Sequence, residues 1–563
     1  SHSGKDLLQF CETYPRDELY QLTDDALYDN AMGILALGER KRLRLLTWAD
    51  PFDRFVSCLV YVPRDAYSTD LRMKLQAILL NAFAGTRAEY DVQLGDATLA
   101  RIHFTVRTVP GQVPPWERKA IEARLAAAAR RWDDELSDAL VEAEGEARGL
   151  ELLERFGRAF PLAYRERVAA RAAVADVRKL AALTPEEPVA VALVRPLGAP
   201  PDTLGFRIYR LGGAVALSDS LPMLERLGAR VIGENNDHLT LPDGTRVALH
   251  DFVLQAQIPD AAEADEVARR FEHTFLLVLR GEVENDDFNR LVLRAGLQAR
   301  EVVVLRAYAK YLKQIGFALS QATIEATLGR HATIARMLVK LFQLRLHPTE
   351  HDDEAAAAQT RALERALEKV ENLSEDRVLR QLQALIECTL RTNFWRTGSG
   401  HSGVAGALRP FLSFKLDSAR VPGLPAPRPM VEIFVYSPRF EGIHLRGGKV
   451  ARGGLRWSDR PDDFRTEVLA LVKAQMVKNT VIVPVGSKGG FVLKKAPPAS
   501  DREAFMKEGI ACYQDYLRGL LDLTDNLVAG KPVAAPQVRR RDGDDPYLVV
   551  AADKGTATFS DYA

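Results

Sequence analysis

The sequence has few cysteines and no long apolar run. Of its 563 residues four are cysteines (Cys11, Cys58, Cys388 and Cys512), and none belongs to a CxxC pair. Four scattered cysteines without a CxxC pair argue against a disulfide framework and against a structural zinc site, and they fit a reducing cytoplasm. Neither a signal peptide nor a membrane span is expected, because no stretch of about 18 apolar residues occurs and no early apolar run is present.

The chain also has no net charge. Its 76 lysine and arginine residues balance its 76 aspartate and glutamate residues, so no overall field attracts nucleic acid or an anionic membrane. Charged residues make up 27% and apolar residues 47% of the chain, which is typical of globular proteins. A chain of this length has room for several domains with sizeable cores.

A β-α-β-β order of elements is predicted twice in the N-terminal half. Residues 52–108 and 203–257 each combine a β-branched strand, a helical stretch and two further strands. This order favours open sheets with helices on one face. Both segments resemble, in topology only, ACT-type regulatory modules, which often bind amino acids. The alternative is a ferredoxin-like scaffold that binds no ligand.

Two other regions have helical periodicity. Residues 114–143 begin with proline and place acids beside bases along one face, which predicts a solvated helix surface. Residues 261–396 are helical in pattern, except that the acidic, Ala-rich stretch after Pro348 is expected to loop out before rejoining as a helix. His273 and His331 lack the spacing and the partner carboxylate of metal ligands, so we interpret both as structural and expect no metal site.

These patterns predict a multidomain protein of mixed α/β and α+β class. We divide the chain into six parts. They are an N-terminal helical segment (1–48), an ACT-like module (49–113), a helical linker (114–188), a second ACT-like module (189–260), a helical domain (261–399) and a C-terminal α/β domain (400–563).

Residues 452–490 hold the densest concentration of chemical groups. Two Gly-rich segments, 452–456 and 484–490, are expected to be turns that flank an amphipathic helix and a short strand at 480–485. Glycine has no Cβ, so such turns let the backbone approach a ligand closely. Arg452, Lys478 and Lys488 would form a pocket for a carboxylate. The neighbouring cations disfavour the ammonium form of Lys488, which would suit this residue to donating and accepting protons.

A basic rim is expected around this pocket. It comprises Arg446, Lys449, Arg456 and Arg460. Of these, Arg456 and Arg460 are interpreted as structural, with partners among Asp459, Asp462 and Asp463.

Four motifs in chain order resemble the substrate-binding domain of amino-acid dehydrogenases, most closely the large NAD-dependent glutamate dehydrogenases. They are Arg452-Gly453-Gly454-Leu455-Arg456, Met476 followed by Lys478, the segment from Pro484 to Gly490, and Asp553-Lys554-Gly555-Thr556. The second and third motifs are each one residue shorter than in the small hexameric members, which have lysine in place of Arg452. Members of the large subclass resemble this chain in the segments HLRGGKVARGGLRWSDR and GSKGGF. Their N-terminal extensions also contain ACT-like modules. An insertion at 497–545 would explain the long gap before Asp553.

The resemblance implies oxidative deamination of L-glutamate to 2-oxoglutarate and ammonia, with NAD as cofactor. Arg452 would face the side-chain carboxylate and Lys478 the α-carboxylate. Lys488 would activate water, and Asp553 would shuttle protons. The remaining substrate-binding residues would be Met476, Gly453, Gly454 and Gly486. The resemblance further implies a homo-oligomer, with an amino-acid effector as a candidate ligand of the ACT-like modules.

One expected motif is absent from the sequence. No G-x-G-x-x-G follows a predicted strand, although a nicotinamide enzyme needs a Gly-rich turn for the pyrophosphate. We therefore expect the 563 residues to be the N-terminal part of a longer polypeptide, with the coenzyme site beyond Ala563, and to be unable to reduce NAD alone. Two alternatives stay open. One is an amino-acid sensor with a degenerate dehydrogenase domain, and the other is a dehydrogenase for leucine, phenylalanine or valine.

Overall fold

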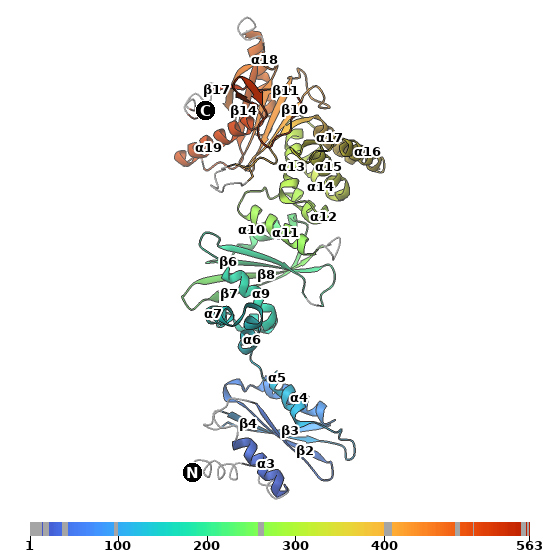
Figure 1. Ribbon diagram of the computed structural model, residues 1–563, viewed down its shortest axis with the longest axis vertical. Coiled ribbons are helices and arrows are strands. Elements are labelled where there is room, and N and C mark those ends of the chain that lie inside the picture. The colour runs from blue at the N-terminus through green and yellow to red at the C-terminus, as the bar shows by residue number, and fades with distance from the viewer. Residues whose placement is uncertain are drawn as a thin grey trace. The chain divides into compact units, whose positions relative to one another are not determined.

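The computed structural model describes most of the chain. The described residues are 14, 22–35, 43–94, 99–196, 198–256, 264–398, 408–478, 485–498, 500–552, 559 and 562. They fall into two compact units, Ser1–Ala181 with Thr240–Gly244, and Ala182–Leu239 with Thr245–Ala563. Figure 1 labels their helices and strands. Among the described residues, no helix combines the length and the apolar character that crossing a membrane requires.

The first unit contains an antiparallel sheet of four strands in the order β1-β2-β4-β3; Figure 1 labels three of them, β2, β3 and β4. The strands are β1 (Arg44–Ala49), β2 (Phe55–Pro63), β3 (Arg87–Gln93) and β4 (Leu99–Arg107). Helix α4 (Thr69–Ala82) begins where the Ser68 side chain accepts a hydrogen bond from Leu71 N. The predicted β-α-β-β order is confirmed, but the prediction missed β1, which lies within the segment expected to be helical.

The other elements of this unit are helices. They are α3 (Asp24–Leu35), α5 (Arg118–Ala128), α6 (Trp132–Glu144), α7 (Glu146–Phe156), α8 (Leu162–Arg167) and α9 (Ala170–Ala181). Trp132, Phe160 and Tyr164 form an aromatic cluster that joins α6 to α8, and the Tyr164 hydroxyl donates to the buried Asp176 of α9.

The second unit begins with a sheet of the same design. Its strands, in the order β5-β6-β8-β7, are β5 (Val189–Val194), β6 (Thr203–Leu211), β7 (Arg230–Thr240) and β8 (Arg246–Gln255). Helices α10 (Leu217–Arg226) and α11 (Ala264–Leu279) belong to the same core cluster as the sheet. The Phe206 ring of β6 lies 5.3 Å from that of Phe271 and 4.8 Å from that of Phe275, both in α11. The predicted order is again confirmed, and a strand before it, β5, was missed.

A helical region follows this sheet. It comprises α12 (Leu291–Arg294), α13 (Ala299–Gln314), α14 (Gln321–Arg330), α15 (Ala332–Leu346), α16 (Asp353–Leu367) and α17 (Leu373–Cys388). Two predictions about it were wrong. The acidic stretch forms α16, because Asp352 caps the helix by accepting from Ala355 N at 2.9 Å. His331 does have a carboxylate partner, since its Nε2 lies 2.7 Å from Glu375 of α17.

The C-terminal sheet has seven described strands, in the order β17-β13-β14-β12-β11-β10-β9. They are β9 (Thr389–Thr392), β10 (Leu412–Asp417), β11 (Val431–Tyr436), β12 (Phe440–Arg446), β13 (Arg452–Trp457), β14 (Ser487–Leu493) and β17 (Val549–Ala552). Strand β13 runs parallel to both β14 and β17, whereas β9 to β12 and β14 pair antiparallel. A small hairpin, β15 (Asn526–Val528) with β16 (Lys531–Val533), follows α19.

Helices α18 (Phe464–Lys478) and α19 (Arg502–Leu521) cover opposite faces of this sheet. A Cβ built on Gly490 of β14 would lie 2.7 Å from Val468 of α18, and one built on Gly489 would lie 2.5 Å from Tyr516 of α19. Neighbouring residues of a strand face opposite sides, so the two glycines identify the α18 face and the α19 face. Residues 502–521 of the segment expected to be an insertion therefore form α19, which packs against the sheet.

Candidate active site

The two Gly-rich segments lie in adjacent strands, so the prediction of turns was wrong. Residues 452–457 form β13, and the residues after Gly486 form β14. The strands pair in parallel, with Leu455 opposite Gly489 and a bridge between Arg452 and Gly486. Glycine content favours a turn when only local conformation is considered. Here the absence of a Cβ instead lets two helices and a neighbouring strand pack closely against the glycines.

Gly453 shows this requirement most clearly. A Cβ at this position would overlap the carbonyl oxygen of Ser487 in the next strand. The bare glycine is therefore needed for β13 and β14 to approach each other at the point where Arg452 begins its strand.

We expect Gly453→Ala to destabilise the C-terminal domain by about 3 kcal/mol, the upper part of the usual range for overpacking. The midpoint of urea unfolding, followed by tryptophan fluorescence, measures this. Gly213→Ala is the matched control, because a Cβ at Gly213 meets no atom within 4 Å. If both variants unfold at the midpoint of the unsubstituted protein, the close approach of the two strands is not a steric requirement.

Lys488 lies in β14 opposite Leu445 of β12 and is half-buried. It is two residues from Gly490 and therefore shares the α18 face. Arg456 of β13 lies on the same face, since its Nε is 2.8 Å from Glu467 of α18. Arg452, four residues earlier in that strand, has the same orientation and is exposed. The structure thus brings Arg452 and Lys488 to one face of two adjacent strands.

Helix α18 ends over this part of the sheet. The side chain of Gln475 donates from Nε2 to the carbonyl oxygen of Arg452 at 2.8 Å. Its Oε1 is buried without a hydrogen-bond partner among the described residues, and it lies 2.9 Å from a Cβ built on Gly486. The helix reaches Lys478 three residues later. Gln475 therefore spans the two glycine strands at their first bridge.

Gln475 is not among the residues predicted from the sequence. An amide that precedes Lys478 by three residues on a helix lies on the same helical face, and that spacing could have revealed it. The side chains of Met476 and Lys478 lie outside the described part of the structure, although α18 includes both residues.

Asp553 and most of the predicted strand at 480–485 also lie outside the described residues. Strand β17 ends at Ala552, which pairs with Leu455 of β13. Asp553 is the residue that follows it in the chain. The edge strand that leads to Asp553 is thus the neighbour of the strand that carries Arg452.

The predicted basic rim needs three corrections. Arg456 pairs with Glu467 rather than with an aspartate, and Asp462 accepts from Lys313 of α13 at 2.8 Å. Arg446 is buried and paired with Asp545, so it is not part of a rim. The pairing of Arg460 with Asp463 is confirmed, with Nε 2.9 Å from Oδ1.

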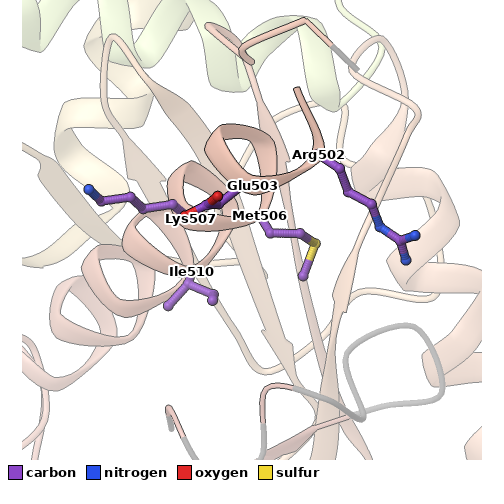
Figure 2. Close-up of a pocket in the computed structure, with 5 residues that line it drawn as sticks. All are labelled: Arg502, Glu503, Met506, Lys507 and Ile510. Carbon is purple, nitrogen blue, oxygen red and sulfur yellow. The ribbon is translucent and has the colours of Figure 1, made fainter. Parts of the chain in front are cut away.

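A hollow of about 640 Å³ lies along α19, on the other side of the sheet from Lys488. Arg502, Glu503, Met506, Lys507 and Ile510 line it, and Figure 2 shows Arg502 and Lys507 extending to opposite sides. All five residues come from one helix and no polar groups converge there, so we assign it no role. The described residues contain no cluster of histidine, cysteine, aspartate or glutamate able to hold a metal.

Comparison with family models covers nearly the whole chain. The model of the catalytic domain of bacterial NAD-glutamate dehydrogenase matches residues 362–563. Glutamate dehydrogenase ACT2 and ACT3 domains match residues 44–133 and 188–267. Glutamate dehydrogenase helical motifs 1, 2 and 3 match residues 1–40, 139–183 and 283–348.

Three curated relatives align with all of the chain. Each is named NAD-specific glutamate dehydrogenase. The protein of Halomonas elongata is 48% identical, that of Pseudomonas aeruginosa 44% and that of Mycobacterium tuberculosis 43%. The chain covers 34%, 35% and 36% of these proteins, so it spans about a third of their length. Together with the strands that carry Arg452 and Lys488, these matches show that the chain belongs to the bacterial NAD-glutamate dehydrogenase family.

Proposed function

We propose that the C-terminal sheet is the glutamate-binding half of an active site that converts L-glutamate and NAD to 2-oxoglutarate, ammonia and reduced NAD. The observation that carries the proposal is the position of Arg452 and Lys488 on one face of adjacent parallel strands, beside the end of α18. A dicarboxylate substrate needs fixed cations, and this face supplies them next to a lysine suited to proton transfer.

The substrate-binding roles follow from the charges. Arg452 would bind the side-chain carboxylate, because a planar guanidinium can donate two parallel hydrogen bonds to it. Lys478 would bind the α-carboxylate, with Met476 packed against the substrate. Gly453, Gly454 and Gly486 would belong to the substrate site, although at Gly453 and Gly486 the space of a Cβ is taken by Ser487 and Gln475 rather than left for a ligand. Gln475 holds the main chain of Arg452 in place.

The proton-transfer roles fall to the lysine and the aspartate. Lys488 would remove a proton from the water that attacks the iminium carbon and would stabilise the oxygen anion that develops there. Asp553 would carry protons to and from the amino nitrogen. Activation of the water needs a half-buried side chain, and Lys488 is half-buried. Partial exclusion of solvent strengthens the electrostatic interactions of this side chain.

NAD is the cofactor that we propose for the whole protein, since the relatives are named NAD-specific. The described residues do not fit this coenzyme. The loop from β13 into α18, residues 458–463, contains no glycine and three aspartates, and the described residues of the loop into α19 also lack glycine. A pyrophosphate needs a Gly-rich turn and is repelled by carboxylates. We therefore derive no hydride-transfer step from these residues.

The test is an assay of the whole protein with L-glutamate, leucine, phenylalanine and valine in turn, following reduced nicotinamide by its absorbance. We expect turnover with glutamate and a lower kcat/KM with the three apolar amino acids. Binding of glutamate without turnover would support a sensor and would contradict the proposal. A preference for an apolar amino acid would contradict the substrate.

The remaining expectations are proposals of the same kind. We propose a homo-oligomer and an amino-acid effector at the ACT domains, and we keep the six-part division of the chain. We also propose a cytoplasmic location, which the free and buried Cys58, Cys388 and Cys512 support.

A further inference from the structure

A buried network of charged side chains joins three strands of the C-terminal sheet to the segment before β17, on the α19 face and therefore on the opposite face from Lys488. Its members, called the ion network below, are Arg391, Lys415, Arg446, Asp525, Asp542 and Asp545. Arg391 lies 2.7 Å from Asp525 and 2.6 Å from Asp542, and the side chains of Arg391 and Asp525 are fully buried. The three basic residues belong to β9, β10 and β12, whereas the acidic residues belong to the segment before β17.

Asp545 is the member that pairs with both Lys415 and Arg446. Its Oδ2 accepts from Lys415 Nζ at 2.6 Å and from an Nη2 hydrogen of Arg446, and its backbone N–H donates to Asp525. Burial raises the pKa of the Asp545 carboxyl, but the hydrogen bond from Arg446 and the charge of Lys415 outweigh burial, and the pKa is lowered. The carboxylate is therefore ionised at neutral pH and holds both cations.

Arg446 connects Asp545 to the catalytic strands. It lies in β12 opposite Ser487 of β14, next to the pair formed by Leu445 and Lys488. Its other terminal nitrogen, Nη1, donates to the carbonyl oxygen of Tyr547 at 2.8 Å. The chain enters β17 two residues after Tyr547. One guanidinium thus joins the strand beside Lys488 to the segment that leads into β17.

Strand β17 depends on this anchor more than its neighbours do. Among the described strands it lies at the edge of the sheet, with β13 as its neighbour, and residues 534–548 before it have no regular structure. Strand β13 is held in addition by β14 and by Gln475. Loss of the anchor would therefore move β17 while leaving Arg452 in place.

Stability alone is a weak explanation for such a network. Desolvating buried charges costs free energy that their attraction barely offsets, and apolar replacements of buried ion pairs are often neutral or stabilising. Ion pairs instead fix the relative orientation of the groups that they join, because each hydrogen bond fixes an angle as well as a distance.

We propose that Asp545 is a positioning residue that, through Arg446 and Lys415, aligns β17 beside the strands of Arg452 and Lys488 for the proton-transfer steps. This inference rests on the proposed function. A displacement of about 1 Å at a catalytic group lowers turnover about 100-fold. The substrate carboxylates are bound elsewhere, so KM should change little.

The test compares Asp545→Asn with Asp544→Asn in the whole protein. Asp544 is adjacent, exposed and paired with Arg540 at 2.7 Å, so it is a matched control. We expect kcat for glutamate to fall about 10- to 100-fold in Asp545→Asn with KM within about threefold, and Asp544→Asn to keep both. Asp545→Glu, which restores the charge, should recover part of the lost kcat.

Each contrary result is informative. A folded Asp545→Asn protein with kcat within about threefold of the unsubstituted one, or a loss confined to KM, overturns the inference. If this variant does not fold, Arg446→Lys takes its place, because it keeps the charge and loses the bond to Tyr547. Failure of both to fold assigns the ion network to stability alone and also overturns the inference. Absence of glutamate turnover in the unsubstituted protein would instead refute the proposed function.

Discussion

Replacing Lys488 with alanine in the whole protein is expected to lower kcat for glutamate by about 10²- to 10⁴-fold, the contribution usual for a general acid–base group. The amine would no longer take a proton from the attacking water or stabilise the oxygen anion. Initial rates of reduced nicotinamide formation at saturating glutamate measure the loss. Glutamate binding should survive, because Arg452 and Lys478 bind the carboxylates in our proposal.

Lys531→Ala is the control for this experiment. Lys531 is exposed on the β15–β16 hairpin and lies outside the proposed site, so its variant should keep the kcat of the unsubstituted protein. A Lys488→Ala protein that is folded and retains more than about a tenth of its turnover would remove Lys488 from the chemical step. The glutamate-dependent response of a sensor would persist in the same variant.

Arg452→Leu is expected to lower kcat/KM for glutamate by about 10- to 150-fold. Hydrogen bonds to a charged partner contribute about 1.5–3 kcal/mol, which corresponds to this range. The loss should be smaller for leucine or valine, because these substrates have no side-chain carboxylate to bind. The ratio of kcat/KM for glutamate to that for leucine is the measurement that isolates the side-chain contact.

Arg460→Leu provides the matched control, since Arg460 is a partly exposed arginine that already pairs with Asp463. It should leave the ratio unchanged. Unaltered glutamate activity in Arg452→Leu would show that another group binds the side-chain carboxylate. If activity on an apolar amino acid exceeded that on glutamate in the unsubstituted protein, the substrate assignment would be wrong.

Period-two and helical patterns predicted much of the fold. The β-α-β-β order at 52–108 and 203–257 follows from alternating apolar residues, because each sheet buries one face against helices of its own unit. The patterns missed β1 and β5, which are short strands outside the predicted segments. They also placed a loop where α16 begins, because the acidic composition of this stretch favours a loop although a single capping aspartate starts the helix.

Residue types and chain order alone predicted the chemistry that we propose: two cations for carboxylates (Arg452, Lys478), a lysine for proton transfer (Lys488) and the motif of Asp553. These proposed roles depend on charge and functional groups, which can be read directly from the sequence. Only the tertiary structure decided that the glycines lie in paired strands, that Gln475 bridges them and that Asp545 is tied to Arg446. These features depend on contacts between residues that are distant in the chain. Arg446 and Asp545, for example, are 99 positions apart. Local propensity contains no information about such contacts.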